Sequence, residues 1–165
     1  MNPLLEDIQL LLTRELSALA KEIEMFPDDG SIWRTLPGVA NPAGVLARHV
    51  CGNLKHFVGG VLGNTGYVRD RENEFNAHSA TRQEVIAEIR ATSEVVSSVM
   101  ARLDEGVLTE DFPLPPIKIT VSGRRFLLHL CTHAAFHLGQ AGYLRRMLND
   151  DPQSSGGLSV RGLVD

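Results

Sequence analysis

Apolar residues recur at helical spacing along four stretches of the chain. The first begins at Asn2-Pro3, a capping residue followed by proline at the first helical position, and continues to about Phe26. The second begins with the same kind of signal, Asn41-Pro42, and continues to about Gly63. Both patterns predict amphipathic helices.

Two further stretches have the same character. Thr81 and Glu84 form a capping-box pattern in front of apolar positions that extend to about Leu103. Ser122 precedes a long pattern that extends to about Asn149. Between them, residues 107–121 contain three prolines, so we expect an extended segment packed along the helices.

Four amphipathic helices without strand-like alternation predict an all-α protein, specifically a four-helix bundle. No internal repeat or linker divides the chain, so residues 1–149 are expected to form a single domain. Residues 150–165 are rich in glycine and serine and are expected to be a flexible C-terminal tail.

Composition narrows the class of protein. Aromatic residues make up 5% of the 165 residues, which predicts a mainly aliphatic core. The net charge of −4 is unlike that of a dedicated nucleic-acid binder. Apolar runs are too short for a membrane span, and Glu6, Asp7 and Arg14 interrupt the N-terminal segment, unlike a signal peptide. Two distant cysteines make no disulfide framework, so a cytoplasmic location is expected.

Histidines provide the candidate chemistry. His129, His133 and His137 follow one another at intervals of one helical turn in the last predicted helix. Imidazoles at positions i and i+4 can bind one metal ion together. Spacing alone permits either the pair 129/133 or the pair 133/137.

A third ligand must come from another helix, and the second predicted helix offers His49 or His56. Three neutral imidazoles suit Zn, Ni, Cu or Fe and leave coordination positions open to a substrate. Cys51 and Cys131 lie two residues from a histidine, which turns their side chains away from the metal face. The alternative is that the histidines are ordinary core or rim residues.

Metal-binding histidines need partners that fix the orientation of their rings. Asn53 lies one turn beyond His49, and Gln140 lies one turn beyond His137. Both are candidates for this role, although either is equally an ordinary polar helix position. In the polar connector, Asp70, Arg71 and Glu74 either line an entrance or form surface salt bridges, and we expect salt bridges.

Three segments resemble the DinB-like superfamily: HLCTHAAFHLGQ at 129–140, LARHVCGNLKHFVGGVL at 46–62 and GYVRDRENEF at 66–75. The resemblance implies an up-down-down-up four-helix bundle, commonly a homodimer, that binds one divalent metal. Its ligands, carried over to this chain, are His49, His133 and His137, with His129 as a neighbour. Leu138 stands where many relatives have arginine, which puts any role of that arginine in doubt.

The resemblance also implies a reaction. We expect a Zn or Ni site that activates a low-molecular-weight thiol for transfer to a small-molecule substrate, or else activates water for hydrolysis. An isomerase acting on a thiol adduct, as in maleylpyruvate isomerase relatives, cannot be separated from the transferase by sequence. The competing hypothesis is a non-catalytic dimeric helical module whose metal site is structural or vestigial.

Overall fold

The computed structural model describes residues 2–114 and 119–163. Within these residues the long elements are all helices, which confirms the predicted all-α class. They are α1 (Pro3–Glu24), α2 (Ala43–Leu54), α3 (Arg71–Asn76), α4 (Arg82–Met100) and α5 (Gly123–Asn149). Short 3₁₀ turns occur at Ser31–Trp33, Glu105–Leu108 and Val160–Leu163.

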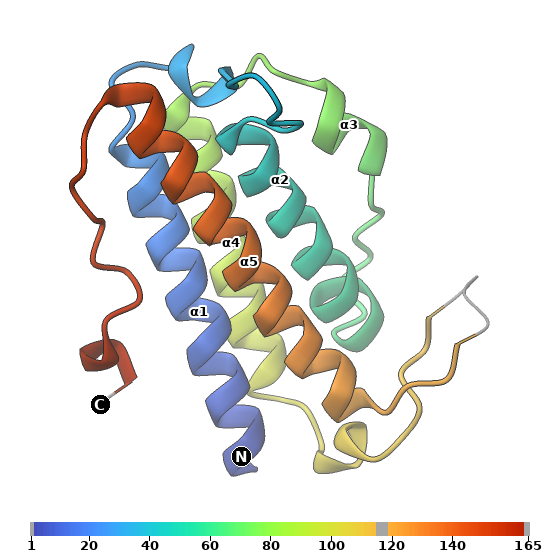
Figure 1. The fold of residues 1–165 in the computed structure, drawn as a ribbon. Coiled ribbons are helices and arrows are strands. Elements are labelled where there is room, and N and C mark those ends of the chain that lie inside the picture. Colours follow the sequence, from blue (N-terminus) through green and yellow to red (C-terminus); the bar gives the residue numbers. More distant parts are fainter. Residues whose placement is uncertain (1, 115–118, 164–165) are drawn as a thin grey trace.

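Four long helices lie side by side (Figure 1). α1 packs on α4 and α5, and α2 packs on the same two helices, so α1 and α2 lie diagonally across from each other. In Figure 1, α1 and α5 run upward whereas α2 and α4 run downward, which makes α2 and α5 antiparallel neighbours. The core between the helices is mainly aliphatic, as the composition predicts, and includes Leu12, Leu16, Ile23, Leu54, Ile89, Val96, Leu127 and Leu130.

The helix starts follow from capping residues. The Asn2 side chain accepts a hydrogen bond from the Leu4 amide at 3.0 Å, and Thr81 and Glu84 form both bonds of the predicted capping box. The prediction for Asn41 is wrong by one residue. Pro42 holds the N-cap position of α2 in an extended conformation, because it lies before the first helical turn, and no side chain caps this helix.

α2 continues directly into a π-helix, Lys55–Leu62, which ends beside Gly63 as predicted. Such segments are rare and often lie near functional sites. The polar connector that follows contains α3, which the hydrophobic pattern did not predict. Asp70 begins this short helix by accepting a hydrogen bond from the Asn73 amide at 3.0 Å.

The segment predicted to be extended, residues 107–121, is partly so. Its start belongs to the 3₁₀ turn Glu105–Leu108, which Asp104 caps by accepting a hydrogen bond from the Gly106 amide. Beyond the turn, the Phe112 amide donates to the Val121 carbonyl at 2.8 Å. Residues 115–118 of this prediction lie outside the described residues.

The segment after α5 returns along α1 (Figure 1). Gly157 lies so close to α1 that a Cβ atom there would be 2.2 Å from Cβ of Ala18. Arg145 is fully buried and donates hydrogen bonds to Glu22 of α1, to Asp151 and to the backbone carbonyl of Gln153. Arg145 therefore joins α1, α5 and this segment. The flexibility of residues 150–165 in solution and the domain boundary at residue 149 stay predictions.

None of the helices in the described part of the chain has both the length and the apolar character that crossing a membrane requires.

Candidate metal centre

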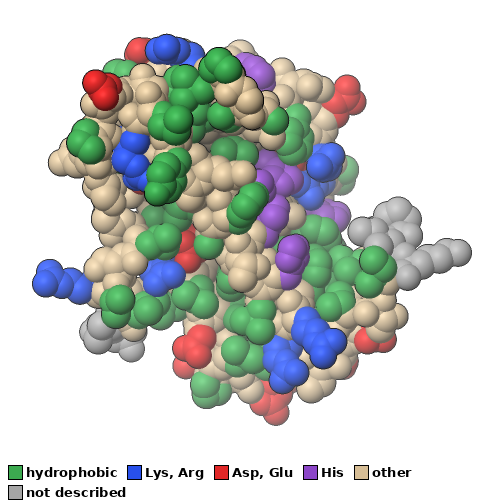
Figure 2. All heavy atoms as spheres, viewed as in Figure 1, with side chains coloured by type: hydrophobic (Ala, Val, Ile, Leu, Met, Phe, Trp, Pro, Cys, Tyr) green, Lys and Arg blue, Asp and Glu red, His purple; other side chains and the backbone are tan. Residues whose placement is uncertain are grey.

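His49, His133 and His137 come together where α2 and α5 lie side by side. His49 projects from α2, and the other two project from consecutive turns of α5. His49 is buried, whereas His133 and His137 are half-buried. Figure 2 shows that histidine side chains gather in a line on this face of the molecule, among hydrophobic side chains. The three residues implied by the resemblance are thus brought together, with His49 buried and the other two partly exposed.

Their Nε2 atoms converge. Nε2 of His133 lies 3.3 Å from Nε2 of His49 and 3.1 Å from Nε2 of His137. Neighbouring nitrogen ligands at about 2.0–2.1 Å from a tetrahedral zinc ion are themselves about 3.3–3.4 Å apart. These two spacings therefore match those of ligands on a common ion, and one ligand atom from each of the three residues lies within 4.8 Å of the others. Among the residues that the structure describes, no fourth histidine, cysteine or carboxylate joins this group.

In two of the three rings, the Nδ1 atom, which faces outward, already has a hydrogen-bond partner. Nδ1 of His49 lies 3.0 Å from Oε2 of Glu74, and Nδ1 of His137 lies 2.8 Å from Oε1 of Gln140. An ionised carboxylate and an amide oxygen can only accept, so both Nδ1 atoms are assigned as the donors; Nη2 of Arg69 also lies 3.2 Å from Nδ1 of His49, but it already donates to Oε2 of Glu74 at 2.7 Å. Each ring is consequently in the tautomer that leaves the lone pair on Nε2, where a metal would bind.

The donor set fits a cation better than it fits a proton. A hydrogen on Nε2 of His133 can be donated well to one neighbouring lone pair, either that of His49 or that of His137. The lone pair of the other neighbour would then face Nε2 of His133 without a hydrogen directed at it. A divalent ion among the three nitrogens would satisfy all of them at once, so the residues fit the metal that the resemblance implies.

Burial favours the neutral form of His133 and His49. Burial, followed by the charges of His137 and His49, lowers the pKa of His133 to about 4. Burial also lowers the pKa of His49, although the hydrogen bond to Glu74 opposes the change. Neutral imidazole is the form that binds metals, so these two ligand positions need not lose a proton near pH 7.

Glu74 of α3 is the residue that holds His49 in place. Its side chain is buried, and Arg69 donates to both carboxylate oxygens, from Nε to Oε1 and from Nη2 to Oε2, each at 2.7 Å. Burial alone would raise the pKa of Glu74, but hydrogen bonds from Arg69 and His49 outweigh it and lower that pKa. The carboxylate is therefore ionised and can polarise the imidazole.

Gly52 makes this arrangement possible. A Cβ atom at position 52 would lie 2.0 Å from Oε1 of Glu74, so only glycine lets α3 bring the carboxylate against α2. Sequence reasoning treated Glu74 as one half of a surface salt bridge and did not connect it with His49. The available signal was its place in GYVRDRENEF, one of the segments that carry the resemblance.

The other candidates have different surroundings. Asn53 is buried, and its Oδ1 has no hydrogen-bond partner among the described residues, so Glu74 occupies the place expected for it beside His49. His129 is exposed, and its ring centre lies 5.9 Å from that of His133. The ring of His56 packs on Phe57 instead of facing the three Nε2 atoms.

Both cysteines are buried away from this group, as the spacing predicts. Burial raises the pKa of Cys51 to about 12 and that of Cys131 to about 11. Neither thiol is therefore ionised near neutral pH, and neither suits a nucleophile.

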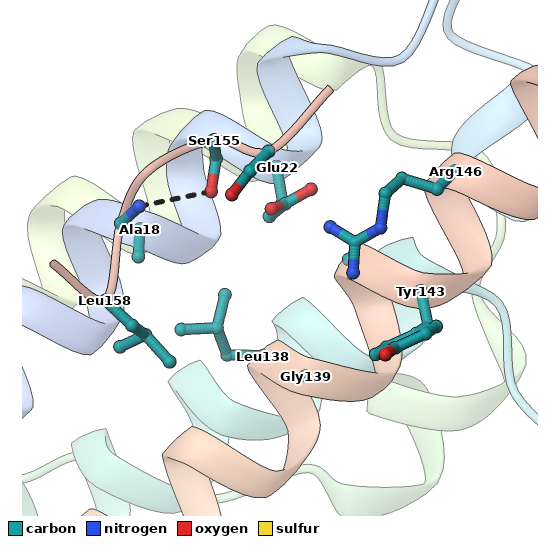
Figure 3. Close-up of a pocket in the computed structure, with 11 residues that line it drawn as sticks. Ala18, Glu22, Leu138, Gly139, Tyr143, Arg146, Ser155 and Leu158 are labelled. Atoms are coloured by element: carbon teal, nitrogen blue, oxygen red, sulfur yellow. Dashed lines mark hydrogen bonds between the residues drawn. The ribbon is translucent and has the colours of Figure 1, made fainter. Parts of the chain in front are cut away.

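A cavity lies away from the histidines, between α1, α5 and the C-terminal segment (Figure 3). Its volume is about 230 Å³, and Glu22 and Arg146 both point into it. Glu22 is already paired with Arg145 at 2.6 Å, and the Arg146 guanidinium stacks over the Tyr143 ring. Both charged groups already have partners in the helices, so we assign no chemistry to this cavity.

Comparison with curated proteins finds no match to the chain. A family described as "protein of unknown function (DUF1572)" matches residues 3–160, which include every histidine of the group and Glu74. The match covers nearly the whole chain, and the protein therefore belongs to the DUF1572 family.

Proposed function

We propose that the protein is a metal-dependent enzyme that holds one divalent ion, Zn or Ni, through Nε2 of His49, His133 and His137. The observation that carries the proposal is the convergence of these atoms, at 3.1 and 3.3 Å, with two rings fixed in the metal-binding tautomer by Glu74 and Gln140. Three protein ligands leave positions for a substrate, which is typical of catalytic sites.

The reaction that we favour is the transfer of a low-molecular-weight thiol to a small electrophile, with hydrolysis as its closest variant. An ion held by neutral ligands lowers the pKa of a thiol or water molecule that it contacts. The chain supplies no thiol of its own for this role, since Cys51 and Cys131 are buried with raised pKa values. The nucleophile must then come from solution.

The protein residues around the ion would orient the histidine rings and balance the charge of Glu74. Glu74 fixes the His49 ring, and Arg69 neutralises the carboxylate by donating to both of its oxygens. Gln140 fixes the His137 ring from α5. His133 and His137 are partly exposed, so a substrate can approach from solvent without a rearrangement of the helices.

The resemblance to the DinB-like superfamily supports the same proposal and adds to it. The helix directions of Figure 1 are those expected of an up-down-down-up four-helix bundle. We extend the proposal to a single bundle domain over residues 1–149, a homodimer and a cytoplasmic location, for which the support is the resemblance and the composition.

Zinc binding and thiol transfer test the proposal together. Isothermal titration of metal-free protein should give one zinc per chain, and the His133→Ala variant should lose this binding. Exposed His78, whose ring stacks on Trp33, offers a matched control, and His78→Ala should retain it. Absence of zinc and nickel binding by the folded, unsubstituted chain would overturn the metal site.

Activity is then measured with 1-chloro-2,4-dinitrobenzene and a panel of glutathione, bacillithiol and mycothiol. In this reaction a carbon–sulfur bond forms, the carbon–chlorine bond breaks, and chloride and a proton are released. Turnover should require both zinc and an intact His133. A zinc-loaded protein inactive with every thiol and in ester hydrolysis would instead support the non-catalytic dimeric module.

A further inference from the structure

A groove begins where the histidine group ends. It lies between α2, α5 and the loop of residues 38–41, and its volume is about 400 Å³. Leu46 contributes from one turn before His49, and Gln140 contributes from one turn after His137. Since α2 and α5 are antiparallel, these two steps lead in the same direction along the helix pair. The groove therefore continues the same interhelical surface as the candidate metal centre.

The lining of the groove is uncharged. Val39, Leu46, Leu144 and Met147 are apolar, and none of the described residues that line it carries a charge. Val39 is 39% exposed and Met147 is 65% exposed, so apolar surface faces solvent there. An uncharged apolar group would remove this surface from water, whereas a charged group would find no partner.

The size of the groove suits a small molecule. The loop that borders it contains a turn, closed by the hydrogen bond from the Val39 amide to the Leu36 carbonyl. Gly38, at φ +83°, allows the chain to make this turn. The volume lies within the range of about 300–1,000 Å³ that is usual for small-molecule sites.

Gln140 connects the groove with the metal centre. It lines the groove and also holds Nδ1 of His137 through its Oε1 at 2.8 Å. A ligand bound against Gln140 would therefore lie beside one of the proposed metal ligands. A molecule with a polar end that binds metal and an apolar body could occupy the metal centre and the groove together.

We propose that this groove binds the uncharged apolar part of a substrate whose polar end lies at His49, His133 and His137. The inference rests on the proposed function and specifies its substrate class: small molecules that carry an aliphatic or aromatic substituent next to the reacting group. Hydrophilic substrates of the same reaction would bind more weakly.

Straight-chain hydroxamic acids test the inference, because the hydroxamate binds zinc and the alkyl chain points away from it. Affinities of the two- to eight-carbon acids for the zinc-loaded protein are measured by isothermal titration. Affinity should rise by up to about fourfold for each methylene that becomes buried. In the Met147→Glu variant the dependence on chain length should disappear, while acetohydroxamate binds as before. Val160→Glu, an exposed apolar position in the C-terminal segment outside the groove, should keep this dependence.

A second measurement needs no metal. Titration of metal-free, ¹⁵N-labelled protein with 1-hexanol should shift the amide resonances of Val39, Leu46 and Met147. If the protein binds no zinc but hexanol still shifts these resonances, the proposed function is refuted and the apolar site is not. Equal affinity along the acid series, or hexanol shifts confined to other surfaces, would overturn the inference. So would a Met147→Glu variant that alters only the oligomeric state, since the groove would then be a contact between copies.

Discussion

Replacement of Glu74 by glutamine tests whether the negative charge beside His49 strengthens metal binding. Glutamine keeps the size of the side chain and can still accept from Nδ1 of His49, but it carries no charge. Its amide group would also place hydrogens opposite the Arg69 guanidinium, which now donates to both oxygens at 2.7 Å. We therefore expect the His49 ring to lose both its polarising carboxylate and its fixed orientation.

The expected size of the effect follows from this geometry. Glu74 is 5% exposed and 3.0 Å from the Nδ1 of His49, so solvent does not screen the contact. Loss of such a partner usually weakens metal binding by about 10- to 100-fold. This corresponds to about 1.4–2.7 kcal/mol, at about 1.4 kcal/mol for each tenfold change.

The assay is zinc affinity measured by competition with a chromophoric chelator at constant pH and ionic strength. Glu88→Gln is the matched control, because Glu88 is also paired, with Lys55 at 2.7 Å, but lies on α4 and contacts none of the three histidines. Circular dichroism verifies that both variants are folded. A folded Glu74→Gln protein that binds zinc within twofold of the unsubstituted chain would refute the reasoning. Equal weakening in the control would also do so, because the loss would then reflect overall charge.

Three other predictions concern stability and reactivity. Arg145→Ala leaves Glu22 buried without its partner and should lower the free energy of unfolding by about 3–5 kcal/mol in urea, whereas Arg146→Ala should cost less than about 1 kcal/mol. Similar losses in the two variants would contradict the assignment of the buried pair. Cys51 and Cys131 have pKa values far above pH 8, so both remain protonated and should react with Ellman's reagent only after denaturation; rapid reaction of the folded protein would contradict their burial. Thr81→Ala removes the capping box of α4 and should cost about 1 kcal/mol in thermal unfolding, and an unchanged transition would show that the cap is dispensable.

The main helices could be predicted because their signals are local. Asn2 and Thr81 act as caps where the sequence places them, and the long pattern after Ser122 ends at Asn149 as expected. The short helix α3 was missed, because six residues contain too little periodicity to distinguish a helix from a polar connector. The error at Asn41 has a similar origin, since an Asn-Pro pair is compatible with a helix that begins either at the proline or after it.

The candidate metal centre likewise contains features that the sequence predicts and features that it does not. The one-turn spacing of His133 and His137 is a property of a single helix, so the sequence alone indicates that both face the same side. Which residue of α2 or of the π-helix that continues it meets them depends on how two helices pack, and the choice between His49 and His56 came from the resemblance. No spacing rule relates Glu74 to His49, because they are 25 positions apart and on different helices.

The position of Glu74 explains why α3 and Gly52 belong to the same functional unit as the histidines. Gly52 is one turn from His49 on α2, and the absence of a side chain there lets the carboxylate of α3 reach Nδ1 of that ring. A methyl group at position 52 would displace Glu74 without removing it or its charge. Gly52→Ala should therefore weaken zinc binding in the same direction as Glu74→Gln, and the double variant should lose little more than either one, because both act on a single contact. Additive losses would mean that Gly52 serves only the packing of α3, and that the orientation of His49 has another origin.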